Sequence, residues 1–128
     1  MTSTPSAGAS TNRGAATFLV VQAALVLLWW VAVLGSRTVR EWFFPYGGLD
    51  PAFVAFVLPD LVFIVGGSIH LAREKLRGNA APRASGILLG AVGYGTLYTL
   101  VWTVLLHAPP AGAIAMVALA AGTWRACR

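Results

Sequence analysis

Four long apolar runs, separated by short segments rich in charge, glycine or proline, dominate the chain. They predict helices over residues of about 15–35, 51–72, 85–107 and 110–124. At a rise of 1.5 Å per residue, a run of about 20 residues crosses a hydrocarbon core of roughly 30 Å. The pattern therefore predicts an all-α fold, an integral membrane bundle of four transmembrane helices.

The polar N-terminus sets the first domain boundary. Residues 1–14 are small, polar and without periodicity, which predicts a disordered tail ahead of a four-helix transmembrane domain over residues 15–128. Arg13 could instead be the basic flank of a signal peptide. The apolar run that follows exceeds the usual 7 to 15 residues of such a signal, which favours a retained helix.

Proline marks where two later helices begin and end. Asp50 followed by Pro51 is a typical start signal, with an acceptor side chain before a proline at the first helical position. Pro109 and Pro110 end the third helix. The fourth run has only about 14 residues before Arg125, short of the roughly 17 needed for a comfortable span.

The distribution of positive charge supports the fourth crossing. With four spans, both termini and the 73–83 segment share one side and hold seven Lys and Arg residues, while Arg37 and Arg40 lie on the other side. Cytoplasmic segments of membrane proteins carry the excess of Lys and Arg. We therefore expect a multi-pass protein of a bacterial-type inner (cytoplasmic) membrane, with both termini on the cytoplasmic side.

Composition narrows the class further. The chain is 58% hydrophobic and only 10% charged, which is unlike a soluble domain of 128 residues. A net charge of +5 would suggest nucleic-acid binding in a soluble protein. Here the cations lie between apolar runs without interleaved aromatic residues, so we expect the lipid bilayer as partner and no nucleic acid.

Asp60 is the only acidic residue inside any of the four runs, and it follows Pro59. A carboxylate at the centre of a membrane helix costs roughly 2.5 to 3.5 kcal/mol on insertion scales, so it normally faces a partner or a cavity. Counting depth from the outer side makes Tyr98 its first expected partner, with Thr99 beside it and Tyr94 one turn deeper. This group is either a structural kink or a site for a proton, an ion or a substrate head group.

Two stripes of small residues predict how the last two helices pack. Lipid tails are as apolar as leucine, so membrane helices associate through close contacts of small residues and through polar bonds. The third helix carries one such stripe and the fourth helix another; they are expected to meet each other, or to form a homodimer seam. The stripes consist of Gly86, Gly90 and Gly93, and of Ala111, Ala115, Ala118 and Gly122.

Other polar and aromatic residues predict the levels at which the helices meet. Gln22 lies level with Gly66 and Gly67, where its amide is expected to bond across helices. Trp29, Trp30 and the aromatic residues of segment 42–46 are expected to form a belt at the headgroup level.

No arrangement of residues typical of catalysis is present in the sequence. His and Cys residues have no metal-ligand spacing, and no HExxH motif, nucleophile elbow or phosphate-binding glycine loop occurs. Acid–base chemistry would need a second group near Asp60, and only tyrosines are available. We therefore expect no catalytic residue, metal or cofactor.

Three short motifs resemble a known family. The motifs are Leu58-Pro59-Asp60-Leu61, Gly66-Gly67-Ser68 and Gly95-Thr96-Leu97-Tyr98. Over residues 15–124 the chain resembles the N-terminal multi-helix membrane portion of bacterial isoprenylcysteine carboxyl methyltransferase-like proteins. The family's methyl-donor site belongs to a downstream domain, so the resemblance implies a detached membrane module without the catalytic domain.

Three functional hypotheses follow. The first is a non-enzymatic membrane module that binds a lipid or a membrane protein partner, with Asp60 and Tyr98 as its internal polar site. The second is a small homo-oligomeric transporter or channel subunit that uses Asp60 as a proton- or cation-coupled carboxylate. The third is the membrane half of a split lipid-modifying enzyme. A cavity that reaches Asp60 would distinguish a binding or transport site from a packed kink.

Overall fold

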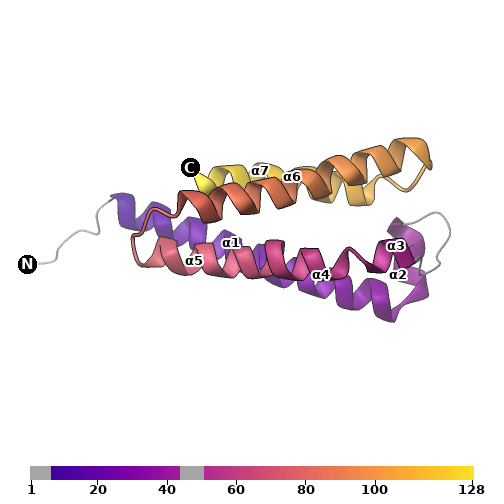
Figure 1. The fold of residues 1–128 in the computed structure, drawn as a ribbon, viewed down its shortest axis with the longest axis horizontal. Coiled ribbons are helices and arrows are strands. Elements are labelled where there is room, and N and C mark those ends of the chain that lie inside the picture. Colours follow the sequence, from indigo (N-terminus) through magenta and orange to yellow (C-terminus); the bar gives the residue numbers. More distant parts are fainter. Residues whose placement is uncertain (1–6, 44–50) are drawn as a thin grey trace, which may run out of the picture.

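A computed structural model of the chain describes residues 7–43 and 51–128, and within these ranges it contains helices and short connections and no strand (Figure 1). The all-helical prediction is confirmed. Residues 44–46 of the expected aromatic belt and the expected cap Asp50 lie outside the described residues.

Helix α1 covers Ala7–Gly35 and begins eight residues before the predicted first span. The prediction of a disordered tail is therefore wrong for residues 7–14, which are helical. Nucleation is the costly step of helix formation, so an apolar helix that already exists can be extended by small residues, each adding one backbone hydrogen bond. The Thr17 hydroxyl also donates to the carbonyl oxygen of Arg13, at 3.0 Å.

Helix α2, Arg37–Phe43, turns back against the end of α1. The guanidinium of Arg40 donates from Nη1 to the carbonyl oxygens of Val33, at 2.8 Å, and Leu34, at 3.1 Å. These carbonyls belong to the last turn of α1, which has no helical donors left, and a cation there also offsets the negative end of the helix dipole. Arg40 thus caps α1 in addition to carrying surface charge.

The second predicted span is a chain of short helical segments. It consists of α3 (Pro51–Val54), a turn at residues 55–56, α4 (Val57–Pro59), the π-helix η1 (Asp60–Gly66) and α5 (Gly67–Leu76). Pro59 has no N–H to donate to the carbonyl oxygen of Ala55, so the α-helical bond across this turn cannot form. The chain is irregular at Pro59, and the irregularity extends into a π-helical stretch, a form that is rare and often found at functional sites.

The connection after α5 is organised by Glu74. Its carboxylate accepts hydrogen bonds from Asn79 Nδ2, at 2.8 Å, and from Arg77 Nη1, at 3.1 Å. The bond from Asn79 and the nearby Arg77 charge hold the pKa of Glu74 below its ordinary value. The chain then enters α6 (Pro82–Leu105), with proline in its first turn, three residues before the predicted start.

Helix α6 ends at Leu105, and His107 has a φ of 50°, the left-handed conformation in which helices commonly end. Helix α7 covers Ala111–Cys127 and extends three residues beyond the predicted end. Its 17 residues correspond to roughly 25 Å of helix.

Two helices of the described part of the chain are long and apolar enough to cross a membrane, α1 over Gly8–Gly35 and α6 over Pro82–Leu105, where the sequence predicts four. The second predicted span falls short because the break near Pro59 divides it into pieces. Helix α7 is apolar but, at 17 residues, shorter than these two helices. The prediction of four spans is thus met in part by helix length and composition.

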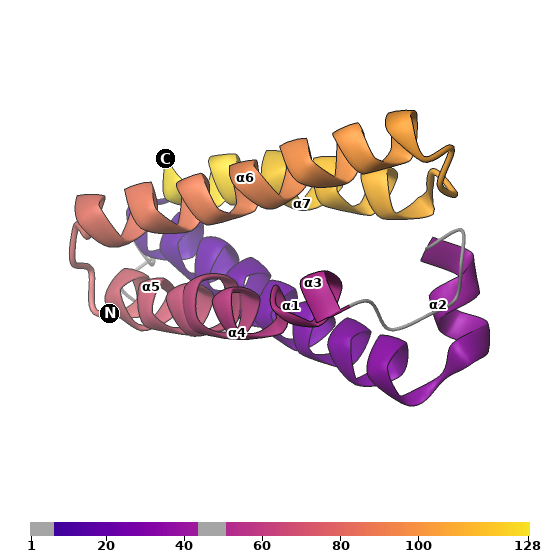
Figure 2. The ribbon, with the colours of Figure 1, turned by 45° about the vertical axis from the view of Figure 1, so that its right-hand side comes forward.

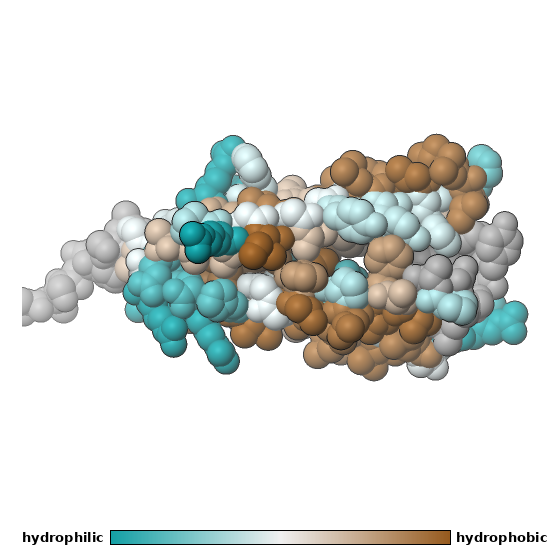
Figure 3. Space-filling view, in the orientation of Figure 1, coloured by the Kyte–Doolittle hydropathy of each residue, from teal (hydrophilic) through white to brown (hydrophobic). Residues whose placement is uncertain are grey.

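The helices run up and down as a bundle. Both ends of the described chain and the α5–α6 connection lie at one end of the molecule, and α2, α3 and the α6–α7 turn lie at the other (Figures 1 and 2). Helix α1 packs on α5 and η1, and α6 packs on α7. In Figure 3 the hydrophilic residues gather at the end with the α5–α6 connection, while apolar residues cover much of the remaining surface.

Candidate functional site

A cleft of about 1010 Å³ lies between two helix pairs. In one pair, α1 packs beside the segment formed by α4 and η1; the other pair is α6 and α7. Figure 3 shows the surface hollowed between the two pairs. This volume is at the upper end of the range for small-molecule sites, which are mostly apolar with a few placed polar groups. The lining consists of Phe18, Gln22, Leu25, Val26, Trp29, Trp30, Phe43, Phe56, Pro59, Asp60, Phe63, Ile64, Ile87, Gly90, Ala91, Val92, Tyr94, Gly95, Tyr98, Thr99, Trp102, Thr103, Pro109, Gly112, Ala115, Met116, Ala118 and Leu119.

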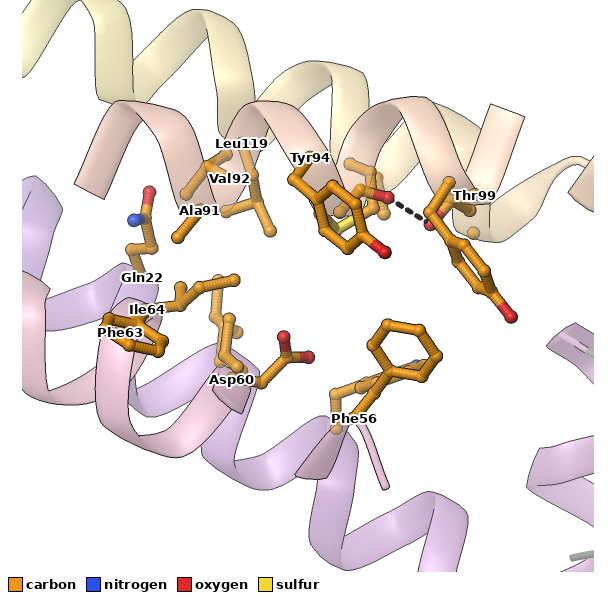
Figure 4. A pocket seen from close by; sticks show the side chains of 18 of the residues that line it. Gln22, Phe56, Asp60, Phe63, Ile64, Ala91, Val92, Tyr94, Thr99 and Leu119 are labelled. Atoms are coloured by element: carbon orange, nitrogen blue, oxygen red, sulfur yellow. Dashed lines mark hydrogen bonds between the residues drawn. The ribbon is translucent and has the colours of Figure 1, made fainter. Parts of the chain in front are cut away.

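Asp60 borders this cleft from the first turn of η1. Figure 4 shows its carboxyl group pointing into the cleft between Ile64 and Phe56. The indole N–H of Trp30 on α1 donates to Asp60 Oδ2, at 3.0 Å. The predicted partner was Tyr98; the bond in the structure comes from α1 instead, because η1 packs directly on that helix.

Trp30 is a site residue that the sequence did not indicate. It is 2% exposed, so the prediction that it belongs to an interfacial aromatic belt is wrong. A signal was available: Gln22, Val26, Trp30 and Val33 recur every three or four residues and form one buried face of α1. A tryptophan on that face needs a partner for its N–H, and Asp60 supplies it.

The three other predicted site residues also line the cleft, from α6. The Tyr98 ring packs on Phe56, with ring centroids 4.6 Å apart. Tyr94 projects into the space above Asp60 (Figure 4), although 62% of its surface is exposed. Thr99 donates to the carbonyl oxygen of Gly95, at 2.7 Å, which satisfies its hydroxyl within α6.

A buried polar network closes the cleft toward the end that carries the termini. Gln22 Nε2 donates to Ser68 Oγ, at 3.1 Å, and the Thr123 hydroxyl donates to Gln22 Oε1, at 2.7 Å. All three residues are at most 1% exposed, and they join α1, α5 and α7. The prediction that Gln22 bonds across helices at the level of Gly67 is confirmed; the contribution of Thr123 was not foreseen.

The small-residue stripe of α6 does not lie in the contact between α6 and α7. A Cβ added at Gly86, Gly90 or Gly93 would meet no atom within 4 Å in the described part of the chain. The contact instead uses Gly95, whose Cβ would lie 3.0 Å from the Met116 methyl group, and Gly112, close to Thr99. The two helices are neighbours as predicted, but they meet through a different face of α6.

The small residues of the α7 stripe likewise do not form the predicted contact with α6. Ala111, Ala115 and Ala118 are exposed, and the latter two line the cleft. A Cβ at Gly122 would collide with the ring of Phe18 on α1, so this glycine admits a helix contact, though not the predicted one with α6. Bulkier residues at Gly90, Ala115 and Ala118, the stripe residues that line the cleft, would leave less open space. These small residues therefore account in part for the cleft.

Comparison of the chain with protein-family models, with curated proteins and with solved structures finds no match. The resemblance to methyltransferase-like membrane segments stays a prediction.

The lining offers binding chemistry more readily than catalysis. Asp60 is its only carboxyl group, and no group of three or more His, Cys, Asp or Glu residues that could hold a metal is found in the described residues. Hydroxyl groups of Tyr94 and Tyr98 can donate or accept hydrogen bonds. One acceptor and two phenols in an apolar cleft can orient a bound molecule.

Proposed function

We propose that this chain is a membrane module whose internal cleft binds a lipid or another lipophilic molecule. The cleft of about 1010 Å³ that reaches Asp60 is the observation that carries the proposal. A carboxyl group held against dry packing would suit a structural kink, whereas Asp60 borders open space between two helix pairs. An apolar lining suits a ligand with a large apolar surface, because burying that surface supplies most of the binding free energy.

The cleft is also open toward the side of the bundle. Phe63 on η1 and Tyr94 on α6 both line it, yet 49% and 62% of their surfaces are exposed. In a bilayer, the medium at this opening would be hydrocarbon, so a lipophilic molecule could enter without crossing water. This feature favours binding of a bilayer component over passage of a hydrated ion along the bundle axis.

We also propose four membrane crossings with both termini in the cytoplasm. The alternating course of the chain supports this topology, because both ends and the α5–α6 connection share one end of the molecule (Figure 1). That end carries seven of the nine Lys and Arg residues. The segments from Pro51 to Ala72, ahead of the charged residues that begin at Arg73, together provide 22 residues, and α7 is accommodated by local thinning of the bilayer.

Single cysteines distinguish four crossings from two. In a Cys127→Ala background, we expect Thr38→Cys to react with a membrane-impermeant maleimide in intact spheroplasts and Ala80→Cys to react only after permeabilisation. If only α1 and α6 crossed the membrane, residues 36–81 would all lie outside. Labelling of Ala80→Cys in intact spheroplasts would therefore overturn the four-span topology.

Two glycines of α6 provide a matched test of the cleft. Gly90 lines it and Gly93 does not, while a Cβ added at either position would meet no atom within 4 Å. We expect a diazirine-bearing long-chain alcohol in liposomes to label cleft residues of the wild-type protein on irradiation. Gly90→Leu should reduce this labelling at least about tenfold, because the leucine side chain would occupy part of the cleft. A tenfold change corresponds to about 1.4 kcal/mol of binding free energy. Gly93→Leu should leave it unchanged.

The yield at cleft residues is read by peptide mass spectrometry. Labelling that is spread evenly over the outer surface, or that is equal in Gly90→Leu and Gly93→Leu, would contradict a binding function for the cleft. A thermal melt of each variant in detergent establishes that both leucine variants are folded when the comparison is made.

A transport function is the second candidate, because the same cleft gives Asp60 access to the space outside the bundle. It differs from binding alone in the predicted behaviour of Asp60→Asn, which retains a hydrogen-bonding group but cannot carry a proton or pair with a cation. Loss of substrate flux in proteoliposomes, with labelling by the neutral alcohol unchanged, would favour transport.

A further inference from the structure

The charge of the cleft lining is one-sided. Among the described lining residues, Asp60 is the only Asp, Glu, Lys, Arg or His. Charged interactions are stronger in an apolar surrounding than in water, and an unpaired charge there is costly. A ligand anion beside Asp60 would find no positive side chain, whereas a ligand cation would find the carboxylate.

The cleft that this carboxyl group enters is also rich in aromatic side chains. Nine of the lining residues are aromatic, among them Trp30, Phe56, Tyr94 and Tyr98. Trp30 donates directly to Asp60, and the Phe56 and Tyr98 rings lie together with centroids 4.6 Å apart. Figure 4 shows Phe56 and Tyr94 on the open side of the carboxyl group. Aromatic faces attract cations, and such groupings recognise quaternary ammonium ligands.

We infer that the cleft selects a lipophilic cation, whose positive charge is spread over apolar substituents as in a quaternary ammonium or phosphonium group. This inference rests on the proposed binding function. A compact ammonium group is strongly hydrated and loses more on entering an apolar cleft. A diffuse cation loses less hydration, contacts the aromatic faces with its substituents and pairs with Asp60 from the open side of the cleft.

The side opening fits the same class of ligand. Tyr94 and Phe63 border it and are partly exposed. Lipophilic cations partition into bilayers, so they reach this opening from the hydrocarbon. The fixed positive residues lie at the ends of the bundle, outside the lining, and therefore do not oppose entry at this level.

The test compares two ions of the same shape and opposite charge. Binding of radiolabelled tetraphenylphosphonium to the purified full-length protein in detergent micelles is measured by equilibrium dialysis, and tetraphenylborate is titrated separately. We expect saturable binding of the phosphonium and no saturable binding of the borate. Asp60→Asn should weaken phosphonium binding about ten- to hundredfold, because a contact to a charged group is lost.

Two variants separate charge from folding. Asp60→Asn keeps an oxygen acceptor for the Trp30 N–H, so the thermal melt of this variant should resemble that of the wild type. Asp60→Glu should retain the preference for the cation.

Each outcome bears on one of the two proposals. Equal phosphonium binding in Asp60→Asn and the wild type, or equal binding of borate and phosphonium, overturns the selectivity for cations. The binding function still holds in that case if labelling by the alcohol depends on Gly90. If Gly90→Leu alters neither labelling nor phosphonium binding, both proposals are overturned.

Discussion

Replacing Trp30 with alanine should lower the free energy of unfolding by about 3–5 kcal/mol, the range for removing a large buried aromatic side chain. Trp30 is 2% exposed, contacts the ring of Trp29 at a centroid distance of 4.7 Å and donates to Asp60. Its loss removes packing between α1 and η1 and leaves the carboxyl group without that donor. Reversible unfolding in mixed micelles, titrated with a denaturing detergent, measures the change.

Trp42 provides the matched control because 63% of its surface is exposed. Trp42→Ala should change stability by no more than about 0.5 kcal/mol, as surface substitutions usually do. Trp30→Phe retains most of the ring packing but not the N–H, and should cost about 1–2 kcal/mol. If Trp30→Ala costs no more than Trp42→Ala, the placement of Trp30 between α1 and η1 is wrong.

The second large effect is expected at Gly122, where even one methyl group should destabilise the bundle. A Cβ at this position would collide with the Phe18 ring, which packs between α1 and α7. Forcing extra volume into such a contact typically costs about 1–3 kcal/mol. The same unfolding measurement applied to Gly122→Ala tests this expectation.

Gly93→Ala is the control for glycine replacement in a helix. Its Cβ would meet no atom within 4 Å, and alanine is the better helix former, so this variant should be unchanged or up to about 1 kcal/mol more stable. Phe18→Leu should restore part of the stability lost in Gly122→Ala, because it removes the atoms that collide. Equal stability of the two alanine variants would show that α1 and α7 do not meet at Gly122.

Much of the polar site could be predicted by counting depth along the helices. Asp60, Tyr94, Tyr98 and Thr99 all line one cleft, although they come from two segments of the chain. Gln22 bonds across helices at the expected level. Depth is predictable because the rise per residue is constant and the polar ends of each run fix the starting point.

Facing directions were less predictable. Trp30 was expected at the membrane interface because tryptophan is common there, yet rotation of α1 turns it inward to Asp60. Gly86, Gly90 and Gly93 were expected to admit α7, yet the glycines that do so are Gly95 and Gly112. Either face of α6 carries small residues, so the pattern alone does not determine which face meets the neighbouring helix.

The sequence by itself determined the helical fold, the apolar character of the long runs, the end of the molecule that gathers the positive charge, and the position of Asp60 along the bundle. These properties depend on composition and on periodicity along one helix. Only the tertiary structure decided that Trp30 is the hydrogen-bond donor to Asp60 and that a cleft remains between the two helix pairs. Both depend on how each helix is rotated about its axis and how far apart the pairs stand, and these quantities are set by the contacts of all neighbouring helices together.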